Sequence, residues 1–360
     1  MMNHKTWLKQ IFPFVLIIAA CTSTGTPQSL SLSTGECLAR AGLPYCATTD
    51  VVTPNYTDMQ QCSGPCTDIP IDFSLCAYPR RVYTAPPYEN NPNPLQLNTI
   101  DEIYVAPHMD DAPLSAGGKI ITQSAEGKKI LVITVFGKGA APLDPFDVGL
   151  FSNYMDRSVE DILAVKAMGA YYKLLNYPEF LFRLPKQPYA DPPPQQVIDS
   201  VTTSVQQIIS AYLRPNGEVY FPLAIGNPPH PDHVVLFNVA KNLAALASKT
   251  YSVHLWEDMS YAVQATCFSN GVSSCLVQRL DQVKNMGLNL VPSNFEMPAA
   301  RLNDKINVLF KYTSQIWDTA LFSEITGGIT VAKVKEAYQS YSESIVNSPS
   351  VFVERYYLIQ

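Results

Sequence analysis

From about residue 100 onward, short apolar runs alternate with segments of helical periodicity, and this alternation restricts the fold more than any other feature. The runs DEIYVAP (101–107), KKILVITVF (128–136), GEVYFPL (217–223) and YSVHLW (251–256) are dominated by apolar residues. Continuous apolar runs are typical of parallel strands that are buried on both faces. We therefore predict an α/β fold of the Rossmann-like, doubly wound type, with a mostly parallel sheet and helices on both faces.

The segments between these runs predict the helices. We expect a helix over 115–125 after the first run, and a second over RSVEDILAVKAMGA (157–170), with Gly169 at its end. Apolar residues recur every four positions from 197 to 209, and a last helix is expected over 232–247. In doubly wound sheets the active site lies beyond the carboxyl ends of the strands. We therefore expect functional residues directly after the apolar runs.

The first residues resemble an export signal. Lys5 and Lys9 precede an apolar segment that is too short to cross a bilayer of about 30 Å as a helix. Ile-Ala-Ala-Cys at 18–21 resembles the lipobox of bacterial lipoproteins, in which the cysteine, here Cys21, is diacylated. A plain secretory signal and a short membrane anchor are the alternatives. We expect an exported bacterial lipoprotein, anchored through Cys21 to a membrane of the cell envelope, on its periplasmic or outer surface.

The chain divides into three expected segments that differ in cysteine content. Residues 1–20 form the expected signal peptide, 21–99 a Cys/Pro-rich tether and extension, and 100–360 the main domain. Cys267 and Cys275 flank a short loop and predict a disulfide, which can persist in an exported chain. Besides Cys21, the extension contains five cysteines, so one is free or bonded elsewhere, and their pairing stays open. These five are Cys37, Cys46, Cys62, Cys66 and Cys76.

Charge and glycine patterns argue against several classes of ligand. The net charge is −6 and the basic residues are scattered, whereas nucleic-acid binding needs clustered cations. SAGGK (115–119) lacks the spacing of a phosphate-binding loop, and no Gly-x-Gly-x-x-Gly follows the first strand, so a dinucleotide cofactor is not expected. We interpret Gly117 and Gly118 instead as residues that let a helix approach the sheet closely.

Two short segments concentrate the residues that carry chemistry. PHMDD (107–111) follows the first apolar run and HPDH (230–233) follows the third. The carboxyl ends of these strands would bring both segments to one edge of the sheet. His108, Asp111 and His233 would then make a three-ligand zinc site with an open position for catalysis.

The neighbours of these ligands suggest the remaining roles. Asp110 would be free to accept a proton from an attacking water molecule, and His230 could stabilise charge on the opposite side. Each segment alone has a plainer interpretation, as a turn with a capping carboxylate or as the start of a helix. The two together favour a metal site. His254 lies inside a predicted strand and is expected to pack rather than to bind metal.

The same segments resemble the PIG-L/LmbE-like zinc-dependent N-deacetylases. That family carries Pro-His-Pro-Asp-Asp-Glu before a glycine pair, and later His-Pro-Asp-His. This sequence has PHMDDAPLSAGG and HPDH, with Met109 and Ala112 where the family commonly has Pro and Glu. The resemblance extends through RSVEDILAVKAMGA, LNYPEF, WEDMSYA and KYTSQ and covers about residues 100–315. We expect the deacetylase domain to comprise residues 100–360.

The resemblance implies a role for each site residue. His108, Asp111 and His233 would bind Zn²⁺ and Asp110 would be the general base. His230, when protonated, would stabilise the oxyanion or donate to the leaving amine, and Asp232 would tune His230. Arg157 would contact the substrate. Alternatively, Arg157 would be a solvent-exposed charge on the helix, paired with Glu160 or Asp161.

The implied activity is hydrolysis of the N-acetyl group of a GlcNAc-type sugar or glycoconjugate, a linear amide, which releases acetate and a free amine. A metal-dependent esterase or phosphoesterase is one alternative, and a glycan-binding lipoprotein without catalysis is another. WEDMSYA (256–262) and Tyr312 could line a sugar-binding groove, or they could be ordinary core residues.

Overall fold

The computed structural model describes residues 97–137, 154–175, 177–183, 192–264, 266–269, 271–312 and 331–360. The expected signal peptide, the expected lipidation site Cys21 and nearly all of the expected extension over 21–99 lie outside the described residues. Within the described part, no helix combines the length and the apolar character that a membrane crossing requires.

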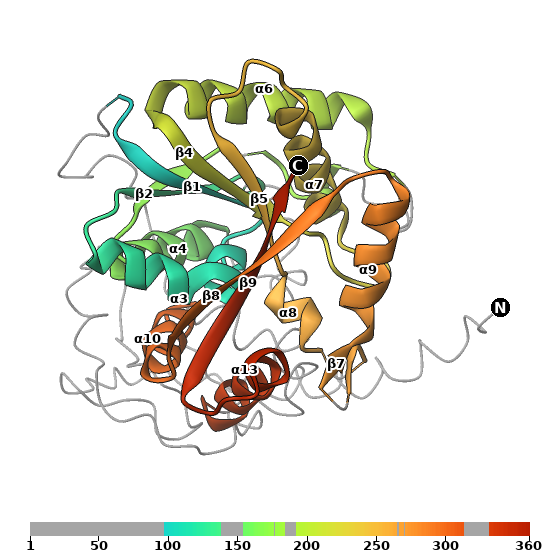
Figure 1. Cartoon of the computed structure of the whole chain (residues 1–360). Helices are drawn as coiled ribbons and strands as arrows, with labels where there is room; N and C mark the ends of the chain where they lie inside the picture. Colours follow the sequence, from blue (N-terminus) through green and yellow to red (C-terminus); the bar gives the residue numbers. More distant parts are fainter. Residues whose placement is uncertain are drawn as a thin grey trace, which may run out of the picture.

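A seven-stranded sheet forms the centre of the molecule (Figure 1). Its strand order is β3-β2-β1-β4-β5-β9-β8, and the first five strands run parallel. β9 pairs antiparallel with both β5 and β8. The predicted α/β fold with a mostly parallel sheet is confirmed. The strands are β1 (Ile100–Ala106), β2 (Ile130–Thr134), β3 (Tyr171–Leu174), β4 (Leu213–Pro222), β5 (Ser252–Trp256), β8 (Leu290–Pro298) and β9 (Val351–Ile359).

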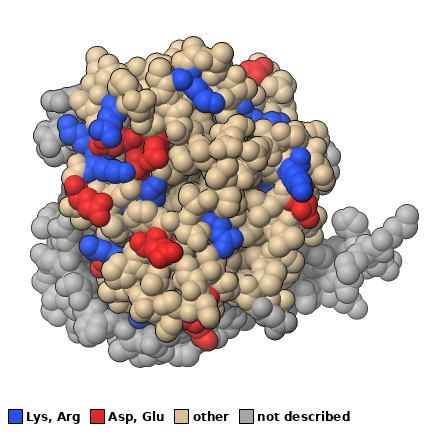
Figure 2. Space-filling model, viewed as in Figure 1, with Lys and Arg blue, Asp and Glu red and all other residues tan. Residues whose placement is uncertain are grey.

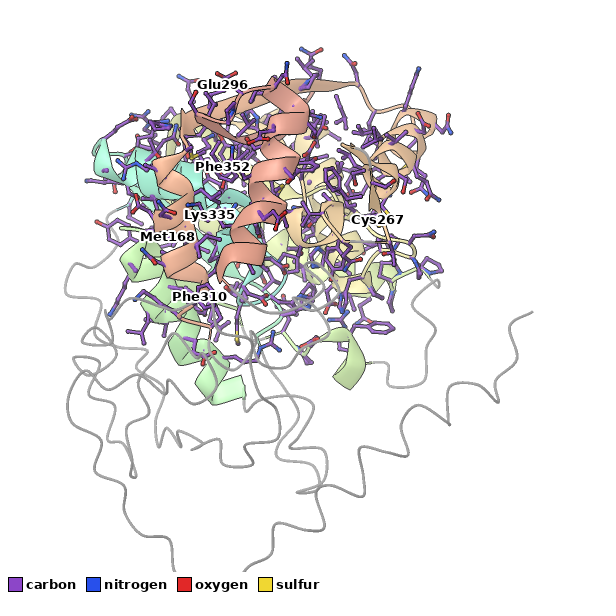
Figure 3. All side chains as sticks on the ribbon, turned by 90° about the horizontal axis from the view of Figure 1, so that it is seen from below. Met168, Cys267, Glu296, Phe310, Lys335 and Phe352 are labelled. Atoms are coloured by element: carbon purple, nitrogen blue, oxygen red, sulfur yellow. A yellow bond between two sulfur atoms is a disulfide. The ribbon has the colours of Figure 1, made fainter. Side chains whose placement is uncertain are left out.

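Helices cover both faces of the sheet. α6 and α7 pack together on one face, whereas α3, α4 and α10 lie on the other (Figure 1). α13 packs on β9 and beside α10, as Figure 3 shows from below. The helices are α3 (Asp111–Ala125), α4 (Tyr154–Ala167), α5 (Phe180–Arg183), α6 (Gln195–Tyr212), α7 (Pro231–Ala244), α8 (Met259–Ala262), α9 (Ser274–Asn285), α10 (Ala300–Leu309) and α13 (Val331–Val346).

The local patterns explain most of these elements. All five residues of β2 are buried, as expected for an inner parallel strand. α6 buries Val201, Val205 and Ile209 from the predicted stripe. Gly169 has a φ of +79° just after α4, a backbone conformation that favours glycine at a helix end.

α3 begins at Asp111, four residues before the predicted start at Ser115. Leu114 N–H already donates to the Asp110 carbonyl oxygen, at 2.9 Å. Pro113 does not prevent this early start, because the first turn of a helix tolerates a residue without N–H. The early start makes Asp110 the N-cap residue of α3.

The predicted disulfide is confirmed. Cys267 and Cys275 are bonded, with their Cα atoms 5.2 Å apart, and they close a small hairpin of β6 (Phe268–Ser269) and β7 (Val272–Ser273) (Figure 3). His254 packs as expected, with its ring stacked on Tyr220 at 4.9 Å between centroids. On the surface seen in Figure 2, charged side chains lie in small groups that mix both signs.

Candidate metal centre

The two histidine segments meet at one edge of the sheet because β1 and β4 are neighbouring parallel strands. The chain winds outward from β1 to β2 and β3 on one side, and the other strands lie beyond β4 on the other side. The strand order therefore reverses between β1 and β4. Doubly wound sheets bind ligands at such a position, beyond the carboxyl ends of the strands. His108 follows β1, and His233 lies in the first turn of α7, which follows β4.

His108, Asp111 and His233 converge there, all three buried. The Oδ2 atom of Asp111 lies 3.2 Å from His108 Nδ1 and 3.3 Å from His233 Nε2. The structure therefore brings together the three residues that the sequence predicted as ligands, with their ligand atoms within 4.8 Å of one another.

A carboxylate on the far side of each ring fixes which nitrogen faces Asp111. Asp232 Oδ2 lies 3.1 Å from His108 Nε2, and Asp258 Oδ1 lies 2.8 Å from His233 Nδ1. Because a carboxylate only accepts, these two ring nitrogens carry protons in this arrangement. The opposite nitrogens are then left to face Asp111 with their lone pairs.

Three acceptors this close together require a positive charge between them. His233 Nε2 is buried and makes no hydrogen bond within the described residues. In the metal-free protein, burial lowers the pKa of His233, but Asp111 and Asp258 outweigh burial and raise it to about 9. A proton then occupies the place that a metal ion would take. Two imidazoles and one carboxylate are a typical ligand set of catalytic zinc, so the residues present fit Zn²⁺.

A second group of potential ligands, His108, Glu179 and His230, lies beside the first. His230 caps α7, and its Nδ1 accepts from Asp232 N–H at 3.2 Å, which leaves the ring proton of neutral His230 on Nε2. His108 Nε2 also carries a proton, for the reason given above. Both imidazoles thus direct N–H groups into the second group of residues. A nitrogen that carries a proton donates a hydrogen bond and cannot bind a metal ion.

Asp110 is buried next to this cluster. Although it is the N-cap residue of α3, its carboxylate makes no capping hydrogen bond. Burial raises the pKa of Asp110, as does the charge of Asp111, while Arg157 and His108 act in the opposite direction. Burial also lowers the pKa of His230 well below its ordinary value, and positive charge on His108 adds to this effect. His230 is therefore neutral in the resting protein.

The charge of Asp232 acts on His230 and raises its pKa, against the larger effect of burial, but the hydrogen-bond partners of the Asp232 carboxylate lie elsewhere. The carboxylate that we expected to tune His230 contacts His108, the Phe180 backbone N–H at 2.9 Å and the Arg183 guanidinium at 2.6 Å. The His230 ring folds back onto the Asp232 amide, so only the backbone of Asp232 bonds to it. With these donors the pKa of Asp232 stays low, at about 2, despite its burial.

Arg157 is buried rather than solvated. Its Nη1 atom lies 3.6 Å from Glu179 Oε2, so it forms an ion pair with Glu179. Burial raises the pKa of Glu179 to about 7, although the charge of His108 opposes this effect. The substrate-binding role of Arg157 stays a prediction.

Sequence reasoning missed Glu179, Arg183 and Asp258 as site residues. Glu179 lies in LNYPEF and Asp258 in WEDMSYA, so both were within segments noted only for their resemblance or their aromatic residues. The expected aromatic groove does not include Trp256 or Tyr312, because both are fully buried in the core.

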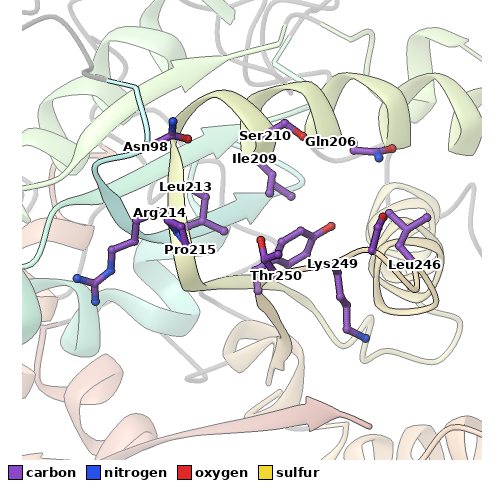
Figure 4. Close-up of a pocket in the computed structure, with 12 residues that line it drawn as sticks. Asn98, Gln206, Ile209, Ser210, Leu213, Arg214, Pro215, Leu246, Lys249 and Thr250 are labelled. Atoms are coloured by element: carbon purple, nitrogen blue, oxygen red, sulfur yellow. The ribbon is translucent and has the colours of Figure 1, made fainter.

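A cavity of about 320 Å³ lies at the opposite edge of the sheet, where β4 begins (Figure 4). Its lining includes Arg214, Lys249 and Tyr251, and none of the predicted site residues.

Comparison with known proteins agrees with this site. Residues 103–244 match the family model described as PIG-L, GlcNAc-PI de-N-acetylase. No curated protein sequence matches the chain closely enough to show a relationship.

Two solved structures show the same fold. The zinc-inhibited form of teicoplanin deacetylase Orf2 is 20% identical with a TM-score of 0.56, over 72% of this chain and 97% of that one. The A40926 pseudoaglycone deacetylase Dbv21 is 18% identical with a TM-score of 0.53, over 73% of this chain and 98% of that one. The segment matched by the family model contains both histidine motifs, and through this segment the chain is similar to the PIG-L/LmbE-like deacetylases.

Proposed function

We propose that this protein is a zinc-dependent amidohydrolase that removes the acetyl group from an N-acetylated sugar or glycoconjugate of the GlcNAc type. The observation that carries the proposal is the convergence of His108, Asp111 and His233 as three buried acceptors, next to the buried carboxylate of Asp110, which makes no capping hydrogen bond. A structural ion site would need the three acceptors but not Asp110. The family match supports the acetamide as the reacting group.

His108, Asp111 and His233 would hold Zn²⁺, which would polarise the acetamide carbonyl and make water at the site far more acidic than bulk water. Asp110 accepts a proton from the attacking water, and its raised pKa favours this transfer. The water oxygen bonds to the amide carbon. His230 donates its Nε2–H to the developing oxyanion as a neutral imidazole. The carbon–nitrogen bond then breaks and the proton on Asp110 passes to the amine nitrogen. The acid product releases the second proton of the water to solvent, so acetate and the amine leave.

The test is hydrolysis of a panel of N-acetylated saccharides by the zinc-loaded protein, scored for acetate and primary amine. We expect the two products in equal amounts, loss of activity with a chelator, and recovery when Zn²⁺ is restored. Acyl and phosphate esters are the comparison substrates. Ester hydrolysis without amide hydrolysis would favour the esterase alternative. Glycan binding without any hydrolysis would favour a binding lipoprotein.

We also propose that the substrate is a glycan of the envelope or its surroundings, since the N-terminal sequence resembles that of an exported lipoprotein. Full-length protein should fractionate with membranes, and a Cys21→Ala variant should not. Retention of this variant in the membrane fraction would contradict the lipid anchor, and it would leave the proposed chemistry unaffected.

A further inference from the structure

We propose that Asp258 is a positioning residue of the metal centre, which holds His233 as the tautomer whose Nε2 faces the metal. This inference rests on the proposed zinc site and names a residue that lies beyond the segment 103–244 matched by the family model. Asp258 Oδ1 lies 2.8 Å from His233 Nδ1, and both side chains are 1% exposed.

The plainer role for Asp258 is to cap α8, because it is the N-cap residue of that helix. Its side chain, however, makes no capping hydrogen bond. Its second oxygen, Oδ2, instead accepts from Ile225 N–H at 3.0 Å, in the loop between β4 and α7. Both oxygens are therefore directed at the elements that carry the HPDH segment.

The neighbours of Asp258 hold it in place. Met259 N–H donates to Ser115 Oγ at 3.2 Å, which ties this turn to α3. The carboxylate of Glu257 accepts from the hydroxyl groups of Tyr341 and Tyr357. Tyr261 packs edge-on against the His233 ring, with 5.2 Å between centroids. The C-terminal part of the chain thus fixes the carboxylate that orients a ligand.

The chemistry of the pair explains why an amide cannot replace this carboxylate. Two N–H donors, from Ile225 and from His233, point at the two oxygens of Asp258. Asparagine offers one oxygen and one NH₂ group. If its oxygen stays on Ile225, its NH₂ faces His233 Nδ1, and the ring proton moves to Nε2. An N–H then projects into the metal position and opposes binding.

The experiment compares zinc affinity by chelator competition in the wild type, Asp258→Asn and Asp258→Ala. Asp281→Asn, on the exposed side of α9, is the matched control. Loss of a carboxylate partner behind a ligating histidine typically costs 10–100-fold in metal affinity, and we expect about this loss for Asp258→Asn and little change for the control. Asp258→Ala should bind zinc better than Asp258→Asn, because alanine does not force the wrong tautomer.

Long-range ¹H–¹⁵N spectra of the imidazoles supply a second readout that does not depend on activity. We expect the zinc-loaded wild type to show His233 protonated at Nδ1, and Asp258→Asn to lose this signature. Near-UV circular dichroism of the zinc-free proteins confirms that each variant is folded. Wild-type affinity and an unchanged His233 signal in Asp258→Asn would overturn the role of Asp258 alone. A wild type that binds no zinc would overturn the metal centre itself.

Discussion

At the scale of single residues, the site combines structural and chemical roles in the same side chains. Asp111 Oδ2 accepts from the backbone N–H of His108 at 2.8 Å and so closes the turn, while the same oxygen faces both imidazoles. His230 caps α7 through Nδ1 and keeps a proton on Nε2. The turn in the first segment and the helix start in the second are therefore both present, and they do not compete with the metal site, because they direct the ligand atoms towards one point.

We predict that His108→Ala and Asp110→Ala fail in different ways. His108→Ala removes one of three ligands and should not retain zinc through dialysis. Asp110→Ala keeps all three ligands and should retain about one zinc per chain, but it should lose on the order of 10²–10⁴ in turnover, the usual contribution of general acid–base catalysis. Metal analysis after dialysis and initial rates of acetate release measure both effects.

His254→Ala is the matched histidine control, because His254 stacks on Tyr220 and belongs to neither group of potential ligands. It should keep both zinc and turnover. Near-native turnover in Asp110→Ala would show that another group accepts the proton from water.

At the scale of elements, the glycine pair in α3 shows how a local pattern reflects a distant contact. A Cβ atom on Gly118 would lie 2.6 Å from Met297 Sδ and 3.0 Å from Glu354 Oε1, which belong to β8 and β9. Glu354 accepts from the backbone N–H groups of Gly118 and Lys119, each at 2.8 Å. The predicted close approach to the sheet is confirmed for Gly118, although the strands that it approaches were not predicted. Gly117 instead faces Lys305 of α10 at an ordinary contact distance.

We predict opposite effects for alanine at the two glycines. Gly118→Ala should destabilise the protein by about 1–3 kcal/mol, as overpacking of a filled core usually does. A Cβ on Gly117 meets Lys305 Cγ at 3.4 Å, an ordinary contact, so Gly117→Ala should gain up to about 1 kcal/mol from helix propensity. Urea unfolding measures both. A Gly118→Ala variant as stable as Gly117→Ala would show that Met297 moves aside without cost.

At the scale of the whole molecule, the sequence predicts the parallel half of the sheet better than the antiparallel half. Four of the five parallel strands, β1, β2, β4 and β5, coincide with predicted apolar runs, and the chain connects them through helices with a recognisable period. β3 is short and only half-buried, and it was not predicted. β8 is largely exposed, and β9 carries the buried Glu354, which pairs with the equally buried Lys305 at 2.7 Å. Charged residues inside a core cannot be identified from local periodicity, because their partners come from other elements. Asp258 was missed for the same reason.

A similar long-range cluster makes the stability of the fold depend on pH. Asp161 on α4 is buried and accepts from Tyr312 at 2.5 Å and from Thr134 on β2 at 2.7 Å. Burial raises the pKa of Asp161 from 3.8 to about 8, and the two hydrogen bonds offset this only in part. Between these values the unfolded chain has released the proton that the folded protein still holds, so rising pH favours unfolding.

We predict that Asp161→Asn removes this dependence, because asparagine stays neutral at every pH. The substitution should shift the free energy of unfolding by a constant amount, while the wild type should lose on the order of 2 kcal/mol relative to the variant between pH 5 and pH 7. Urea unfolding of both proteins at several pH values measures the difference, in which contributions from other titrating groups cancel. Parallel profiles across this range would show that Asp161 is ionised in the folded protein, with its charge stabilised by the hydroxyl groups of Tyr312 and Thr134.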